Sequence, residues 1–302
     1  MSYDGAEFCG WQIQPQEPSV QEVVERALGT LLRDRVQVTG AGRTDTGVSA
    51  SFYVAHFDFD GPVPAPLADA RDSLDCKQLR FKLNAILPKS VSIIGITPAA
   101  PDFHARFDAK KRQYTYFLHR VKDPFCERYS YLYAYPEVDF GAMNRAAAQL
   151  LGTHDFSCFE KSGGDNKTSV CTVFSARWEP YEPVLRSAPS TPPGPSTYSG
   201  VFVDGEPCSR LPSTYSGDFV DGEPRYWRFT IEADRFLRNM VRAIVGTLLE
   251  VGRGRRSAEE FSSLILHVTE EQGAVPSKGP SRRSDAGESV PGHALFLSGI
   301  EY

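Results

Sequence analysis

The clearest local signal in this chain is the pattern of an amphipathic helix between Ser19 and Arg33. Apolar residues recur there at the i, i+3, i+4 and i+7 spacing of one helix face: Val20, Val23, Val24, Ala27, Leu28, Leu31 and Leu32. Ser19 followed by Glu22 forms a capping-box motif, in which both side chains satisfy N–H groups of the first turn. A helix of this kind buries its apolar face, so it predicts a packed core beside it.

Strand patterns alternate with helix patterns along the rest of the chain. The predicted strands cover residues 35–40, 51–60, 91–98, 112–120, 167–179, 225–233 and 293–302. The further predicted helices cover residues 79–87, 139–152, 234–251 and 257–268. We therefore expect an α+β protein with an N-terminal half over residues 1–105 and a C-terminal half over residues 106–302.

Length and composition exclude several classes of protein. The 302 residues suffice for one large domain or two ordinary ones, and 41% apolar with 24% charged residues is typical of a folded globular chain. The formal charge of −5 gives the whole chain no attraction for nucleic acid, so any RNA site has to be local. Because no run of about 18 apolar residues and no basic, apolar leader is present, we expect a cytoplasmic protein without contact to a membrane.

The six cysteines contain no C-x-x-C pair, which argues against a zinc site or a redox motif and indicates reduced thiols.

A short segment occurs twice in the C-terminal half. PSTYSGVFVDGEP at 195–207 returns as PSTYSGDFVDGEP at 212–224. Two copies are too few for a solenoid, which buries a core only by stacking at least three units. We predict a Pro-rich loop over about residues 180–224 without a catalytic role.

The loop GAGRTDTGV at residues 40–48 is the strongest candidate for a site. Its glycines allow a sharp turn and close approach of another molecule, while Arg43 and Asp45 present one cation and one carboxylate. A tight turn in which Asp45 accepts backbone hydrogen bonds would explain the loop equally well.

The triplet Asp45-Thr46-Gly47 also matches the nucleophile signature of aspartic proteases. Those enzymes need two carboxylates that share a proton, and the chain has no second triplet. Arg43, two residues away, favours the ionised carboxylate over the shared proton. The protease interpretation is therefore disfavoured.

Two clusters of cations indicate RNA binding. On the predicted helix 234–251, Arg235, Arg238 and Arg242 lie beside the apolar stripe, although a solvated helix face would look the same. In the second cluster, Lys110, Lys111 and Arg112 precede two tyrosines, Tyr114 and Tyr116, on one face of a strand. Cations beside exposed rings suit phosphates and unpaired bases, whereas a half-buried sheet face is the simpler alternative.

Five blocks in order along the chain resemble the TruA-type tRNA pseudouridine synthases: YDGAEFCGWQIQP, GAGRTDTGV, FHARFDAKKRQYTY, FLRNMVRAIVGTLLEVGRG and SVPGHALFL. The resemblance implies isomerisation of uridine to pseudouridine in the anticodon stem-loop of tRNA, at about positions 38, 39 and 40. It implies two ferredoxin-like (RRM-like) halves that share an extended antiparallel sheet, with helices on one face and an active-site cleft between the halves. It also implies a homodimer that uses no metal and no cofactor.

The same resemblance assigns roles to matched residues. Asp45 corresponds to the catalytic nucleophile and Arg242 to the arginine that pairs with it. Arg43 corresponds to the residue that helps extrude the nucleotide, and Tyr114 to the ring that stacks on the target base. The remaining expected substrate contacts are Leu295, Arg235, Arg238, Lys110, Lys111 and Arg112.

The chain departs from the family pattern at Ser49, where histidine is usual, and at Ala294, where glycine is common. Two alternatives to the synthase stay open: a non-catalytic tRNA-binding or RNA-folding protein on the same scaffold, and a synthase that acts on other RNAs. The presence of both Asp45 and Arg242 favours the enzyme. Attack at C1′, attack at C6 and elimination to a glycal are equally compatible with the sequence.

Overall fold

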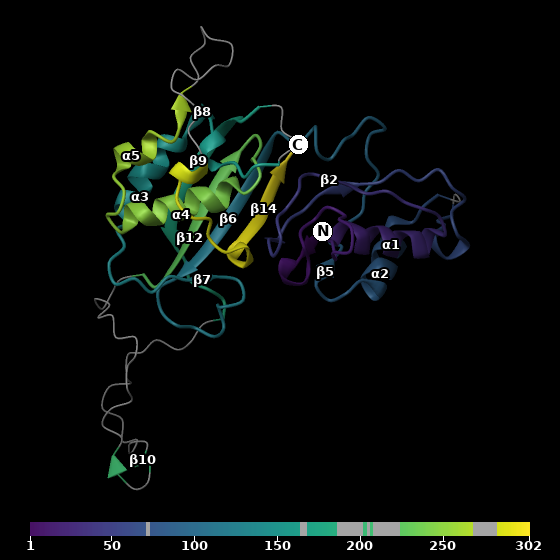
Figure 1. The fold of residues 1–302 in the computed structure, drawn as a ribbon. Helices are drawn as coiled ribbons and strands as arrows, with labels where there is room; N and C mark the ends of the chain where they lie inside the picture. The colour runs from purple at the N-terminus through teal and green to yellow at the C-terminus, as the bar shows by residue number, and fades with distance from the viewer. Residues whose placement is uncertain (71–72, 164–167, 186–201, 204–205, 208–223, 268–282) are drawn as a thin grey trace.

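The computed structural model describes residues 1–302 except 71–72, 164–167, 186–201, 204–205, 208–223 and 268–282. A ten-stranded sheet runs through the described residues in the order β13-β8-β9-β12-β6-β14-β3-β1-β5, with β7 beside β6 (Figure 1). Its strands are β1 (Ser2–Tyr3), β3 (Ser49–Ala50), β5 (Val91–Ser92), β6 (Lys111–His119), β7 (Tyr131–Leu132), β8 (Gly152–Asp155), β9 (Val170–Pro180), β12 (Tyr226–Ala233), β13 (Leu266–His267) and β14 (Leu295–Glu301).

The sheet is mixed, which corrects the expectation of an antiparallel sheet. Most neighbours are antiparallel, and β12 pairs in this way with both β6 and β9. However, β14 runs parallel to β3, with Phe296 opposite Ser49 and Leu297 opposite Ala50, and β7 runs parallel to β6. Strand β14 therefore joins the strands from residues 1–92 to those from residues 111–301.

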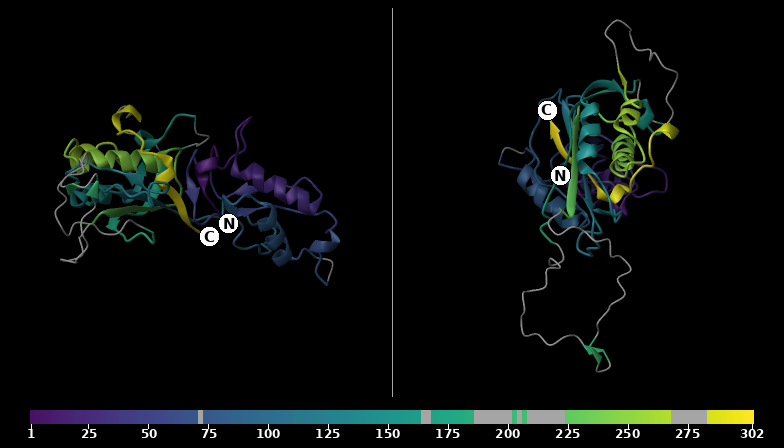
Figure 2. Two further views of the ribbon diagram at one scale, coloured as in Figure 1. Left: turned by 90° about the horizontal axis from the view of Figure 1, so that it is seen from below. Right: turned by 90° about the vertical axis from the view of Figure 1, so that its left-hand side faces the viewer.

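Five α-helices are described: α1 (Val20–Leu32), α2 (Cys76–Ile86), α3 (Phe140–Ala147), α4 (Met240–Gly252) and α5 (Ala258–Ser262). Helix α1 confirms the strongest prediction, because the Ser19 hydroxyl accepts the Glu22 N–H at 3.2 Å and the predicted stripe faces the core. The reciprocal capping box forms instead at α5, between Ser257 and Glu260. Helices α3, α4 and α5 lie together on one side of β9, β12 and β6 (Figure 2).

Helix α4 begins six residues later than predicted. The Asp234 carboxylate accepts the N–H groups of Thr172 at 2.8 Å and Arg235 at 2.7 Å, which holds the chain out of a helix after β12. Asn239 then adopts a left-handed conformation, with φ of 64°, immediately before the helix. Arg235 and Arg238 therefore precede α4, and the predicted arginine stripe with Arg242 on a single helix is wrong.

Two predicted strands around the candidate loop are short. Within the predicted strands 35–40 and 51–60, only β2 (Thr39–Gly40) and β4 (Ala55–His56) form, and they pair with each other as a separate antiparallel sheet. The N–H groups of Ser51 and Phe52 both donate to the Leu297 carbonyl, so the chain turns away from the sheet directly after β3.

The duplicated segment lies mostly outside the described residues. Of it, the structure describes the paired strands β10 (Phe202–Val203) and β11 (Glu206–Pro207). The five cysteines within the described residues are free thiols, and Cys208 lies outside them.

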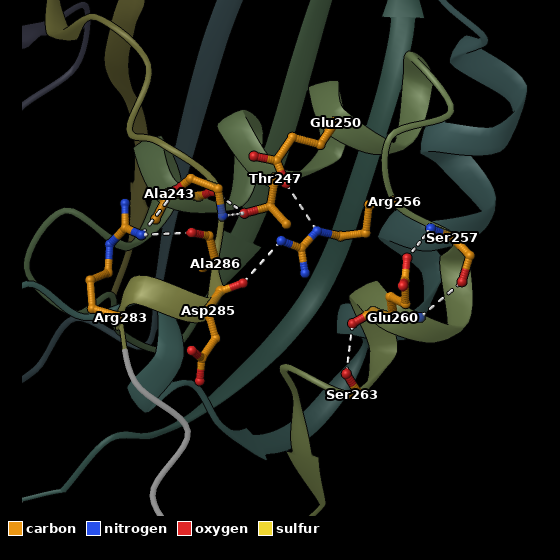
Figure 3. A network of polar contacts seen from close by, with 11 residues as sticks. Ala243, Thr247, Glu250, Arg256, Ser257, Glu260, Ser263, Arg283, Asp285 and Ala286 are labelled. Carbon is orange, nitrogen blue, oxygen red and sulfur yellow. Dashed lines mark hydrogen bonds and ion pairs between the residues drawn. The ribbon is translucent and has the colours of Figure 1, made fainter.

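A polar network fastens the segment before β14 to α4 (Figure 3). Arg256 donates to the Glu250 carboxylate and to the Asp285 carbonyl, both at 3.0 Å, while the Gly287 N–H donates to the Thr247 hydroxyl at 2.9 Å. At Gly246 the segment approaches so closely that a Cβ would lie 1.8 Å from the Glu288 carbonyl oxygen. The start of β14 is thereby fixed against α4.

Candidate active site

A cavity of about 830 Å³ contains nearly all the predicted site residues. Its walls come from the loop around Asp45, the segment 106–114, the segment 234–242 and the start of β14. Nine of the ten predicted residues line it: Arg43, Asp45, Lys110, Arg112, Tyr114, Arg235, Arg238, Arg242 and Leu295. The structure thus brings together side chains that are up to 252 positions apart in the sequence (43 to 295).

The loop that carries Asp45 is held by the backbone of residues 8–11. Trp11 N–H donates to the Thr44 carbonyl at 3.2 Å, and the Gly47 N–H donates to the Phe8 carbonyl at 3.2 Å. Gly47 has φ of 76°, which favours glycine, and a Cβ on Gly10 would lie 2.3 Å from the Thr44 oxygen. These contacts fix the peptide groups on both sides of Asp45.

A buried aromatic cluster formed by Tyr3, Trp11 and Tyr53 packs against the same loop. The Tyr3 hydroxyl is 2.9 Å from the Thr44 hydroxyl, and the Tyr53 hydroxyl donates to the Gly42 carbonyl at 2.5 Å. Trp11 stacks on Tyr53 with ring centroids 4.2 Å apart. Burial raises the pKa of both tyrosines above the usual value, so their hydroxyls keep the protons needed for these hydrogen bonds.

Asp45 and Arg242 face one another across the cavity, with 3.8 Å between Oδ2 and Nη1. The Arg242 Nε donates to the Val290 carbonyl at 2.7 Å, so the guanidinium is anchored to the segment that precedes β14. Asp45 and the anchored guanidinium of Arg242 thus form an oriented ion pair at the cavity.

Tyr114 forms an apolar wall beside Asp45. The side chain is 8% exposed, and its ring meets Phe236 edge-on with centroids 5.0 Å apart and an interplanar angle of 84°. Burial, and then the negative charge of Asp45, raises the pKa of Tyr114 above its ordinary value. The hydroxyl is therefore protonated at neutral pH, and the ring offers a flat uncharged surface.

Arg112 connects three walls of the cavity through backbone carbonyls. Its guanidinium makes five hydrogen bonds, which equals its number of N–H donors. They reach the carbonyls of Ala41, Arg106, Ala109 and Asp234 at 2.6 to 3.2 Å. The structure therefore gives Arg112 a positioning role in addition to its place in the cavity.

Lys111 is the one predicted site residue that does not line the cavity. Alternation along β6 turns it to the other face of the sheet, where Nζ lies 3.2 Å from Glu301 and 4.0 Å from Glu232. Its charge is matched locally by these two carboxylates.

Exposed or half-buried cations line the cavity and define what we call its rim: Arg43, Lys110, Arg235 and Arg238. Arg238 donates to the carbonyls of Ser162 at 3.3 Å and Gly163 at 3.4 Å, and Arg235 donates to the Thr168 carbonyl. The Arg43 side chain is exposed. These groups give the rim the local positive charge that the composition conceals.

Comparisons with known proteins identify the family of this chain. A family model described as tRNA pseudouridine synthase matches residues 146–302. A protein of Bacteroides fragilis, named tRNA pseudouridine synthase A, is 40% identical over 302 residues, which is 100% of this chain and 94% of the relative. The chain belongs to the tRNA pseudouridine synthase family. Its members are isomerases.

Two further relatives of the family carry the same name. A protein of Bacteroides thetaiotaomicron is 41% identical over 100% of this chain and 88% of the relative. A protein of Chlorobaculum tepidum is 34% identical over 88% of this chain and 86% of the relative.

Several cavity residues of this family member had no role assigned from the sequence: Phe236, Asn239, Arg106 and Phe107. Arg106 and Phe107 belong to the FHARFDAKK block, so their position in a motif was the available signal. Ser49, at the position where histidine is usual, is buried, and its hydroxyl accepts the Gly5 N–H at 3.0 Å.

Within the described residues, no group of three or more His, Cys, Asp or Glu side chains is arranged to hold a metal ion. No helix in the described part of the chain has the length and apolar character needed to span a bilayer.

Proposed function

We propose that this protein isomerises uridine to pseudouridine in the anticodon stem-loop of tRNA, at about positions 38, 39 and 40, with Asp45 as the nucleophile. The observation that carries the proposal is the Asp45–Arg242 pair, 3.8 Å apart, at a cavity walled by Tyr114. The names of the relatives, tRNA pseudouridine synthase A, support tRNA as the substrate.

The reaction makes demands that this cavity meets. The bond between C1′ and N1 breaks, the uracil turns, and a new bond joins C1′ to C5. The hydrogen of C5 leaves as a proton, and N1 takes up a proton from solvent. In the routes that begin with attack at C1′ or C6, the Asp45 carboxylate forms a transient covalent adduct with the nucleotide and is regenerated. In a glycal route it assists the elimination instead, and no route consumes an external group donor. Arg242 orients the carboxylate through their ion pair. Attack at C1′, attack at C6 and a glycal route all use this arrangement.

The remaining residues fit a substrate that has left its helix. A base undergoing chemistry has to be extruded and held against a flat apolar surface, which Tyr114 and Leu295 provide. Arg43 assists extrusion from its exposed position beside Asp45. Arg235, Arg238 and Lys110 at the rim bind phosphates.

The decisive experiment is tritium release from tRNA transcripts labelled at uridine C5. Asp45→Asn should abolish release while tRNA binding persists. Asp60→Asn, at an exposed carboxylate that does not line the cavity, is the matched control and should retain full activity. If the unmodified protein binds tRNA but releases no tritium from any of the tRNAs tested, the result would instead favour the non-catalytic RNA-binding alternative.

We further propose that each chain folds as two ferredoxin-like halves, residues 1–105 and 106–302. We also propose that two copies of the chain form a homodimer, and that the dimer acts in the cytoplasm. Exposed apolar side chains near α2 support self-association: Phe81 is 72%, Ile86 48% and Ile94 53% exposed. Arg80 donates to the Ile94 carbonyl at 3.1 Å, which places Ile94 beside this helix. Light scattering that finds only monomer at micromolar concentration would contradict the homodimer.

A further inference from the structure

Phe107 presents an exposed aromatic ring at the rim of the cavity. Its side chain is 74% exposed although it lines the same cavity as Asp45 and Tyr114. An isolated exposed phenylalanine needs no explanation, but one at the entrance to an active site is a candidate binding group.

The ring is held in place by the turn that carries it. The His104 Nδ1 accepts the backbone N–H groups of Arg106 and Phe107, both at 3.2 Å. The Asp108 carboxylate accepts the backbone N–H of His104 at 2.7 Å. The imidazole of His104 also stacks on the Phe107 ring, with centroids 4.2 Å apart and an interplanar angle of 28°. Phe107 is therefore preorganised: a ligand that stacks on it does not have to order the loop first.

The surroundings of the ring select an anionic, aromatic ligand. The guanidinium of Arg106 lies 5.8 Å from the centroid of Phe107, and Lys110 lines the cavity nearby in sequence. An exposed ring with a guanidinium beside it combines base stacking with phosphate binding, as surfaces for unpaired nucleic acid do.

The cavity has room for more than the target base. Asp45, Tyr114 and Leu295 surround the place proposed for the reacting uracil, whereas Phe107 lines the cavity from the turn that precedes β6. A volume of about 830 Å³ is near the upper end of the range for small-molecule pockets, which is much more than a single pyrimidine ring fills.

We infer that Phe107, backed by His104 and flanked by Arg106, is a stacking site for an unpaired base that neighbours the target uridine. The inference rests on the proposed function, because it takes the nucleotide at Asp45 to be part of a tRNA strand. Phe107 then holds the strand beside the cavity while a target uridine reaches Asp45.

The test compares Phe107→Ala, Phe107→Leu and Phe107→Trp on an anticodon stem-loop RNA. Loss of one stacked base should weaken binding about 5- to 150-fold for the alanine and leucine variants. The tryptophan variant should bind as the unmodified protein does, with emission quenched by the RNA. Tritium-release kinetics should show the loss in KM, with kcat changed much less.

Two controls make the result specific to the ring. Phe125→Ala removes a ring that is 62% exposed and does not line the cavity, and it should leave RNA binding unchanged. Binding is also measured in the Asp45→Asn background, so that stacking is scored even when no turnover occurs. Failure of the proposed function, with no tritium release by the unmodified protein, is thereby separated from failure of this inference.

Three results would overturn the inference. The first is unchanged affinity and KM in Phe107→Ala and Phe107→Leu. The second is loss of binding in Phe107→Trp as large as in Phe107→Leu, because a stacking site accepts another aromatic ring. The third is conversion of an oligomer to monomer by Phe107→Ala, which would assign the ring to an interface between copies of the chain.

Discussion

Arg112 holds the carbonyl of Ala41 with two hydrogen bonds, 3.1 Å from Nε and 2.8 Å from Nη2. Ala41 lies four residues before Asp45, so this contact anchors the start of the loop, while the Trp11 contact with Thr44 anchors the residue next to Asp45. The same guanidinium also reaches Asp234 and Arg106. One side chain on β6 thus sets the spacing between the loop and the two segments that face it.

Arg112→Lys should lower the rate of tritium release at least tenfold while tRNA binding changes little. A lysine ammonium keeps the charge but has three donors in place of five, so several of the carbonyls lose their partner. Hydrogen bonds from a charged group contribute about 1.5–3 kcal/mol each, and a lower melting temperature should accompany the loss. Single-turnover kinetics and thermal unfolding measure both effects. Lys111→Arg, on the other face of the sheet, is the control, and an equal loss there would contradict the role of Arg112.

Gly246→Ala should reduce both stability and activity, although the site is far from Asp45 in the sequence. The new methyl group would lie 1.8 Å from the Glu288 carbonyl oxygen and push the segment before β14 off α4. Overpacking of this kind costs about 1–3 kcal/mol, and the shift also withdraws the Val290 carbonyl from Arg242. Urea unfolding and tritium release check the two effects. The matched variant Gly141→Ala meets only side chains of Asp139 and Arg145 and should be tolerated.

Arg242→Lys should decrease the chemical step by about 10²–10³, the loss typical of removing one preorganised electrostatic contact. Arg242 forms an ion pair with Asp45 and a hydrogen bond with the Val290 carbonyl through different nitrogens, which a single ammonium cannot reproduce. The rate is measured under single-turnover conditions with saturating enzyme. Arg238→Lys should retain the chemical step, and a similar rate in both variants would argue against the carboxylate partner.

Binding of tRNA should weaken steeply as salt rises, because the cations at the rim are proposed to contact phosphates. Arg238→Ala should make the slope of log affinity against log salt shallower by about 0.7–0.9. Filter binding between 50 and 200 mM salt, a range in which counterion release is readily resolved, measures the slope. A flat response of the unmodified protein would contradict the proposed arginine contacts.

Acid should destabilise the fold through His119. The imidazole is fully buried between Ser130 at 2.9 Å and Glu127 at 3.3 Å, and burial lowers its pKa below the usual value. The unfolded chain therefore binds a proton at a higher pH than the folded chain, so the free energy of unfolding falls as pH drops below about 6.5. Urea unfolding at pH 7.5 and 5.5 should show a smaller loss for His119→Gln than for the unmodified protein. Equal losses of unfolding free energy in the two proteins would show that His119 does not cause the acid sensitivity.

Local signals predicted the elements that depend on neighbours in the sequence. Helix α1 follows from its apolar spacing and from Ser19, and β6, β9 and β12 follow from alternation. Local signals did not predict the start of α4, because the hydrogen bond that keeps Asp234 out of the helix comes from Thr172, 62 residues earlier. The parallel pairing of β14 with β3 likewise depends on residues almost 250 positions apart.

The candidate site shows the same division. Residue types and the family motifs selected Asp45, Arg242 and Tyr114, all of which line the cavity. The motif could not show that Lys110 lines the cavity and Lys111 does not, because this difference comes from the alternation of side chains at the start of β6. The partners of Arg112 are carbonyl oxygens, which every residue carries, so no pattern of side chains could predict them.

The position of β14 has a consequence for the order in which this protein can become active during its synthesis. Because β14 lies between β6 and β3, a ribosome-bound chain that has reached residue 290 contains Asp45, Tyr114 and Arg242 but has an interrupted sheet. Leu295 at the start of β14, which completes the cavity wall, is also missing from such a chain. We therefore expect a nascent chain to lack tritium-release activity until β14 has emerged and closed the gap.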